Sequence, residues 1–87
     1  MEEFLKEIGI TQKGKIENDS YIIDIKDYNQ YVDFYSLLNK SHLVDELETK
    51  SHISLEDTNI NYISDRYLIN LNADLNNDIY RLTCTEV

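Results

Sequence analysis

Apolar and polar residues alternate most regularly in the last third of the chain. From Tyr67 to Leu75 every odd position is apolar, and polar side chains occupy positions 70, 72 and 74. A period of two residues is typical of a strand that buries one face and exposes the other. The pattern therefore predicts a half-buried strand over residues 67–75.

The apolar positions change from odd to even after Asn76-Asn77, where Tyr80, Leu82 and Cys84 follow. A two-residue turn at Asn76-Asn77 keeps both apolar sets on one face, whereas a shift of one residue would turn one set toward water. We therefore expect a hairpin with three apolar cross-strand pairs: Ala73 with Tyr80, Leu71 with Leu82, and Ile69 with Cys84.

Further strands are predicted earlier in the chain. Tyr21, Ile23 and Ile25 alternate with other residues after Asn18-Asp19, which favours a tight turn and a hairpin with residues 15–17. Two weaker strand candidates, Ile53–Leu55 and Ile60–Tyr62, flank a polar turn predicted at residues 56–59.

Two segments have helical spacing. In residues 2–8, Phe4, Leu5 and Ile8 share one face, and Gly9 is a natural stop. Asp27 is expected to cap a longer central helix, because Gln30 follows at the capping-box spacing.

The central helix has one broad apolar stripe, with Phe34 at its edge. The residues expected to face the sheet are Tyr28, Tyr31, Val32, Tyr35 and Leu38. The apolar residues that follow lie at a different angle, so we expect a kink or restart near residues 39–41, with Ser41 as a second cap and helix to about Glu48.

These elements predict a small single α+β domain over residues 1–87. An antiparallel sheet, formed by the C-terminal hairpin or meander, packs against the central helix, and a short helix precedes it. A chain of 87 residues is long enough for one modest core.

Charge adds a second constraint. The chain has 17 acidic and 8 basic residues, a net charge of −9. Residues 1–15 carry three acidic residues and three lysines, so the excess lies beyond them, concentrated in 16–33 and 45–65. An acidic surface argues against direct binding to nucleic acids or anionic membranes.

Several features favour a cytoplasmic protein. The first residues are acidic where a signal peptide requires basic ones, and no apolar run approaches the length of a membrane span. A single cysteine, Cys84, excludes an internal disulfide and fits a reducing compartment.

The residues offer little catalytic chemistry. His42, Asp45 and Glu46 have a helical spacing that could hold a metal, but a solvated helix face explains them better. Cys84 lies on the predicted core face without a neighbouring cation to activate it. There is no glycine-rich phosphate loop. We therefore expect a non-enzymatic protein without a cofactor or metal.

The favoured hypothesis is a binding module whose carboxylates face a basic protein. A compact acidic protein can occupy the groove in which a nucleic-acid-binding protein or nuclease holds phosphates, and nearby tyrosines can anchor it. In size, charge and composition the chain is similar to small phage-encoded inhibitors that mimic DNA, such as anti-CRISPR and anti-restriction proteins. Two alternatives remain: an immunity protein or antitoxin against a basic toxin, and a generic acidic interaction domain.

The hypothesis assigns the contacts to eight acidic residues and one tyrosine of the central helix. They are Asp24, Asp27, Asp33, Asp45, Glu46, Glu48, Glu56, Asp57 and Tyr31.

Overall fold

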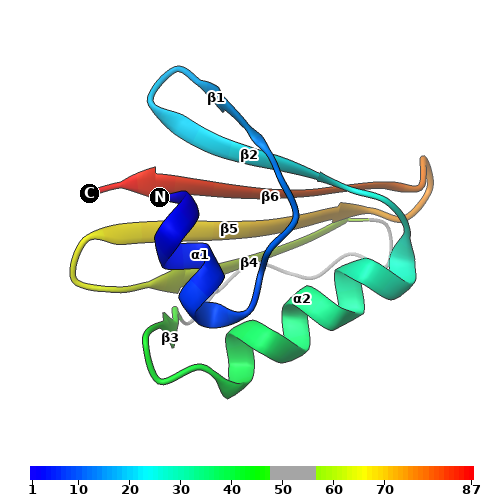
Figure 1. The fold of residues 1–87 in the computed structure, drawn as a ribbon. Coiled ribbons are helices and arrows are strands. Elements are labelled where there is room, and N and C mark those ends of the chain that lie inside the picture. Colours follow the sequence, from blue (N-terminus) through cyan, green and yellow to red (C-terminus); the bar gives the residue numbers. More distant parts are fainter. Residues whose placement is uncertain (48–56) are drawn as a thin grey trace.

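One antiparallel sheet forms the framework of the protein. A computed structural model describes residues 1–47 and 57–87. In chain order the elements are α1 (Glu2–Ile8), β1 (Lys15–Glu17), β2 (Ser20–Ile25), α2 (Tyr28–Lys40), β3 (Asp45–Glu46), β4 (Asp57–Ile63), β5 (Tyr67–Asp74) and β6 (Ile79–Glu86). The six strands lie in the order β1-β2-β6-β5-β4-β3, and both helices cover the same face (Figure 1). The predicted α+β class is confirmed.

The C-terminal hairpin has the predicted register. Ala73 pairs with Tyr80, Leu71 with Leu82, and Ile69 with Cys84, and five of these six side chains are fully buried, with Tyr80 5% exposed. The ladder ends where Asp74 pairs with Ile79. Residues 75–78 therefore connect the two strands without ladder pairs. The strands nevertheless have the register that a two-residue turn at Asn76-Asn77 would give.

Strand β6 also pairs with β2, and this pairing extends the apolar face. Its cross-strand partners on that face are Tyr21 with Cys84, Ile23 with Leu82, and Ile25 with Tyr80. The predicted turn between β1 and β2 is confirmed: Asn18 and Asp19 have φ values of 51° and 66°. Positive φ at both central residues gives the twist that a two-residue hairpin needs.

The helices close the core from one side. Leu5 and Ile8 of α1 are buried, and the helix ends as expected at Gly9, whose φ is 111°. The Asp27 cap is also confirmed, because its Oδ1 accepts a hydrogen bond from the Gln30 backbone N–H at 2.9 Å. Neither helix in the described part of the chain has the length and apolar character to cross a membrane.

The predicted buried face of α2 was wrong in its orientation. Tyr31 and Leu38 are buried as expected, and Phe34, which was placed at the edge of the stripe, is only 5% exposed. Tyr28, Val32 and Tyr35 lie outside the core, with 52%, 38% and 39% of their surface exposed. The apolar stripe is wider than the contact between helix and sheet, so that positions 31, 34 and 38 point at the sheet.

The prediction of helix beyond residue 40 was wrong for residues 41–47. Ser41 has an extended conformation, and its Oγ accepts a hydrogen bond from the Leu43 backbone N–H. The chain then turns so that Val44 enters the core and β3 pairs with β4. Burial of Val44 and the strand pairing replace the helical hydrogen bonds that this segment would otherwise make.

The polar turn predicted at residues 56–59 was wrong for residues 57–59, which belong to β4. Cross-strand pairing with β5 explains the strand, because Thr58 pairs with Ala73 and Asn59 with Asn72. The strand predicted at Ile60–Tyr62 is confirmed. The one predicted at Ile53–Leu55 lies outside the described residues.

Replacing Leu82 with alanine tests the position of the core. Leu82 lies on the central strand and has no exposed surface, so Leu82→Ala should lower the free energy of unfolding by about 2–5 kcal/mol. The control is Leu68→Ala on β5, because Leu68 is 37% exposed and lies on the uncovered face; its cost should be about 1 kcal/mol or less. Urea denaturation measures both, and equal losses would contradict the assigned core.

The protein should lose stability at alkaline pH. Burial raises the pKa of Cys84 from 9.0 to about 11, and a hydrogen bond to Asp78 is the main cause that raises the pKa of Tyr80 from 10.0 to about 12. The unfolded chain loses these protons first as the pH rises, so their contribution to the unfolding free energy is constant below about pH 9 and falls above it.

Urea midpoints measured between about pH 7 and pH 11 test this expectation. In Cys84→Ala the fall should begin nearer pH 10, the usual pKa of tyrosine, because the raised pKa of Tyr80 then remains as a cause of the fall. Stability that rises with pH in this range would contradict the described burial of Cys84.

Candidate functional site

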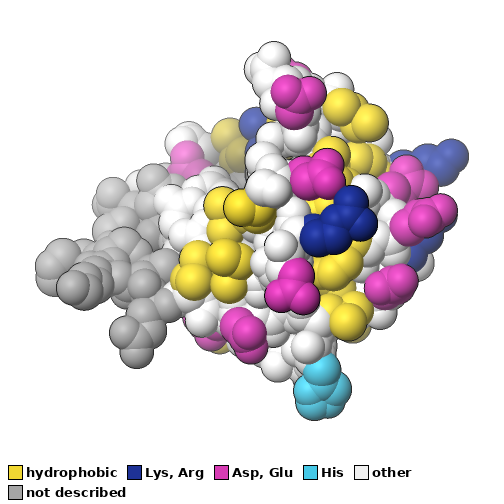
Figure 2. All heavy atoms as spheres, turned by 90° about the vertical axis from the view of Figure 1, so that its left-hand side faces the viewer, with side chains coloured by type: hydrophobic (Ala, Val, Ile, Leu, Met, Phe, Trp, Pro, Cys, Tyr) yellow, Lys and Arg dark blue, Asp and Glu magenta, His cyan; other side chains and the backbone are white. Residues whose placement is uncertain are grey.

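A shallow groove lies at the end of the sheet where β4 turns into β5. Its volume is about 780 Å³, and it is open to solvent. The lining comes from α1 (Glu3, Phe4, Glu7), from the connection after α2 (His42, Leu43, Asp45) and from the turn Ile63–Tyr67. Figure 2 shows this end of the molecule, where acidic side chains lie among hydrophobic ones.

An aromatic contact holds α1 against the sheet at this place. The rings of Phe4 and Tyr67 have their centres 4.6 Å apart, at an angle of 35°. Leu5 and Ile8 anchor the other side of the helix in the core. The acidic residues of α1 are therefore held in a fixed position beside the start of β5.

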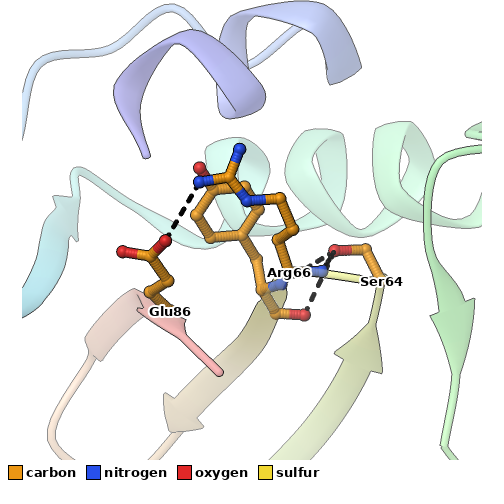
Figure 3. Close-up of polar contacts among 4 residues, drawn as sticks. Ser64, Arg66 and Glu86 are labelled. Atoms are coloured by element: carbon orange, nitrogen blue, oxygen red, sulfur yellow. Dashed lines mark hydrogen bonds and ion pairs between the residues drawn. The ribbon is translucent and has the colours of Figure 1, made fainter.

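The turn between β4 and β5 is held by Ser64. Its backbone N–H donates to the Tyr67 carbonyl oxygen at 2.9 Å. Its Oγ accepts hydrogen bonds from the backbone N–H groups of Arg66 and Tyr67, at 3.3 and 3.0 Å (Figure 3). These bonds place Asp65 and Arg66 at the groove, and the Val87 backbone N–H also supports the turn by donating to the Arg66 carbonyl oxygen at 2.8 Å.

Arg66 is already engaged within the protein. Its Nη2 lies 3.1 Å from Glu86 Oε1, and its guanidinium carbon lies 5.6 Å from the centre of the Tyr67 ring (Figure 3). The hydrogen bond with Glu86 raises the pKa of Arg66 above its usual value. Glu86 thus balances the charge of this arginine.

The carboxylates of the groove lack such partners. Within residues 1–47 and 57–87, none of Glu3, Glu7, Asp45 and Asp65 forms an ion pair with a lysine, arginine or histidine. Glu3 and Glu7 are also one helical turn apart, where like charges destabilise a helix by about 0.2–0.5 kcal/mol. The groove therefore keeps a negative potential that favours cations.

The structure does not bring the predicted contact residues onto one face. Asp24 forms an ion pair with Arg81 at 3.1 Å on the uncovered face of the sheet, and Asp27 caps α2. Asp33 is exposed on α2, and Asp45 lines the groove. Glu46 lies opposite the buried Tyr62, on the side of the sheet that faces the helices.

Of the remaining predicted contacts, Asp57 begins β4 and pairs with Asp74, whereas Glu48 and Glu56 lie outside the described residues. Tyr31 is 8% exposed, and its hydroxyl lies 2.9 Å from Thr58 Oγ1. It therefore has little surface to offer a partner, and the more exposed tyrosines of α2 are Tyr28 and Tyr35.

Sequence reasoning missed three acidic residues of the groove: Glu3, Glu7 and Asp65. The first two were passed over because the lysines of residues 1–15 balance the charge of that segment. Their spacing of four residues was the available signal, since it places both carboxylates on one side of a helix. Nothing local indicated that Asp65 lies near them.

The groove presents carboxylates and apolar side chains together. The helical spacing considered for a metal at His42, Asp45 and Glu46 does not exist, because this segment is not helical. In the described part of the chain no three potential ligands are grouped around a metal position. Cys84 is buried, and its raised pKa disfavours the reactive thiolate. The carboxylates can hold ammonium or guanidinium groups, and Phe4, Leu43 and Tyr67 can contact their aliphatic chains.

No protein-family model, curated protein or solved structure matched the chain in the three comparisons made with it.

Replacing Glu7 with lysine should stabilise the protein. The change removes the repulsion with Glu3 and creates a favourable Glu-Lys pair at a spacing of four residues, a gain of about 0.5–1 kcal/mol at low salt. Glu7→Gln is the matched control and should give about half of this gain, because it removes the repulsion without forming the pair. Urea denaturation at low and high salt measures both; a loss of stability in Glu7→Lys would show that Glu7 has a stabilising contact.

Proposed function

We propose that the protein is a non-enzymatic inhibitor that binds a basic protein in the groove with which that protein holds nucleic acid. The observation that carries the proposal is the set of groove carboxylates that form no ion pair within residues 1–47 and 57–87. Two of them, Glu3 and Glu7, repel each other on one helix although a single substitution would relieve the repulsion. A feature that costs stability in the free protein is expected where function requires it.

The net charge of −9 supports the same proposal. A phosphate-binding groove of a nuclease or DNA-binding protein is lined by lysine and arginine and surrounded by counterions. An acidic protein that enters it releases these ions and is attracted from a distance, which raises the rate of association. Such an inhibitor would act in the cytoplasm, where its target meets nucleic acid.

The shape of the groove adds a route to specificity. Charged contacts at the rim of an interface contribute mainly to association, whereas desolvated apolar contacts contribute most of the affinity. Leu43 is 43% exposed beside Asp45, and the contact between Phe4 and Tyr67 lies beside Glu3. A lysine or arginine of the partner can therefore pair with a carboxylate while its aliphatic chain covers these side chains.

The test requires the partner, which affinity capture from an extract of the source organism can supply. Association rates of the purified pair are then measured between about 50 and 300 mM salt, a range in which surface electrostatics is progressively screened. The groove variant Glu3→Gln/Glu7→Gln/Asp45→Asn should associate more slowly than the wild type. The control Glu17→Gln/Asp19→Asn/Asp74→Asn changes the net charge equally but leaves the groove intact.

We expect the association rate to fall as the salt concentration rises. At low salt it should be lower for the groove variant than for the control variant. Association that does not depend on salt would contradict an electrostatic interface. Equal rates for the two variants would show that overall charge, and not the groove, attracts the partner. A toxin-neutralising protein, in contrast, would bind while its partner retained nucleic acid.

A further inference from the structure

One side of α2 exposes three large side chains that the core does not use. Tyr28, Val32 and Tyr35 are 52%, 38% and 39% exposed. At about 100° per residue they fall within about 60° of one another on the helix, and the centre of this set lies roughly 95° from the centre of the buried set Tyr31, Phe34 and Leu38. These three residues, called here the tyrosine flank, form a continuous partly apolar strip along the helix.

Neighbouring rings hold one end of the flank in place. The Tyr28 ring centre lies 6.0 Å from that of Tyr31 and 6.1 Å from that of Tyr80. Tyr31 is in turn fixed by the contact between its hydroxyl and Thr58. Tyr28 is thus an ordered ring with about half of its surface available, and such a ring loses little conformational entropy when a partner covers it.

Carboxylates lie at both ends of the flank. Asp27 precedes Tyr28 and caps the helix with Oδ1, while Asp78 stands two residues before Tyr80, whose ring lies beside that of Tyr28. At the other end, Asn39 bonds both the Tyr35 carbonyl oxygen and the Tyr62 hydroxyl, and Glu46 lies opposite Tyr62 on β3. In the described parts of the chain no lysine or arginine pairs with Asp27, Asp78 or Glu46.

The protein itself shows which cation suits this combination of groups. Arg66 lies over the Tyr67 ring while its Nη2 bonds the carboxylate of Glu86 (Figure 3). A planar guanidinium group can stack on an aromatic face and donate in its own plane to a carboxylate, whereas an ammonium group has no plane with which to stack. In the tyrosine flank, Tyr28 corresponds to Tyr67, and Asp27 and Asp78 correspond to Glu86. Within the described residues no arginine takes the place that Arg66 has there.

We propose that the tyrosine flank binds an arginine-bearing segment of the basic partner, with the guanidinium stacked on Tyr28 and bonded to Asp27 or Asp78. The inference rests on the proposed function, because it takes from it that the partner is a basic protein. It adds a second contact surface and a preference for arginine over lysine. Val32 and Tyr35 extend the contact to apolar side chains of the same segment.

Peptides of nine arginines and of nine lysines serve as probes of equal charge. They are titrated at low salt into the full-length protein labelled with ¹³C at its tyrosine rings, and binding is followed by NMR. The arginine peptide should shift the ring signals of Tyr28 and Tyr35 more than those of the buried Tyr21 and Tyr62, and it should bind more tightly than the lysine peptide.

Two substitutions at position 28 separate the effect of ring stacking from the effect of charge. Tyr28→Leu should weaken binding of the arginine peptide about two- to fivefold and leave the lysine peptide nearly unaffected. Tyr28→Phe keeps the ring and should bind the arginine peptide as the wild type does. Unchanged circular dichroism and thermal midpoint would show that both variants keep the fold.

The outcomes separate this inference from the proposed function. If both peptides bind with equal affinity, or if the Tyr28 signal does not move while Glu3→Gln/Glu7→Gln/Asp45→Asn weakens binding, the tyrosine flank is not the site and the acidic binding function stands. If neither peptide binds at low salt, the electrostatic basis of the proposed function fails together with the inference.

Discussion

The pairing of β6 with strands on both of its sides is the constraint on which the structure depends. Leu82 and Cys84 are fully buried because each lies between two apolar partners, Ile23 and Leu71 for the first, Tyr21 and Ile69 for the second. A shift of one residue in either pairing would turn these side chains away from the helices. The pairing of β5 with β4 on its other side ends at Ile63 and Leu68, which sets where the turn at Ser64 lies and where α1 and that turn meet to form the groove.

The parts of the fold that local sequence determines were predictable. The hairpin of β5 and β6 follows from the change of apolar parity, and the caps at Asp27 and Gly9 follow from residues next to them. The orientation of α2 and the path of residues 41–47 were not predictable, because each depends on distant partners. Val44 leaves the helical pattern to enter a core built by strands far along the chain, and β3 exists only as a partner of β4.

The acidic character of the groove was predictable from the sequence, but its place in the structure was not. Charge indicated a cationic partner, but sequence cannot show which carboxylates the fold already uses. Asp24 is balanced by Arg81, 57 residues away, and Asp27 bonds the backbone of its own helix. Glu3 and Asp65 are 62 positions apart and line one groove because Phe4 packs on Tyr67. The acidic residues of the described part thus divide into those with a bond inside the protein, such as Asp24 and Asp27, and those of the groove, which form no ion pair there.

We propose that the carboxylates of the groove described above enter the site at which a basic partner protein holds nucleic acid. Fluorescence anisotropy of a labelled nucleic acid bound to the purified partner tests it most directly, as increasing amounts of this protein are added. If the two compete for the groove of the partner, the anisotropy falls to the value of free nucleic acid, with a midpoint that rises with nucleic-acid concentration. Anisotropy that stays high or increases while the protein binds would mean that a ternary complex forms, and it would contradict the claim.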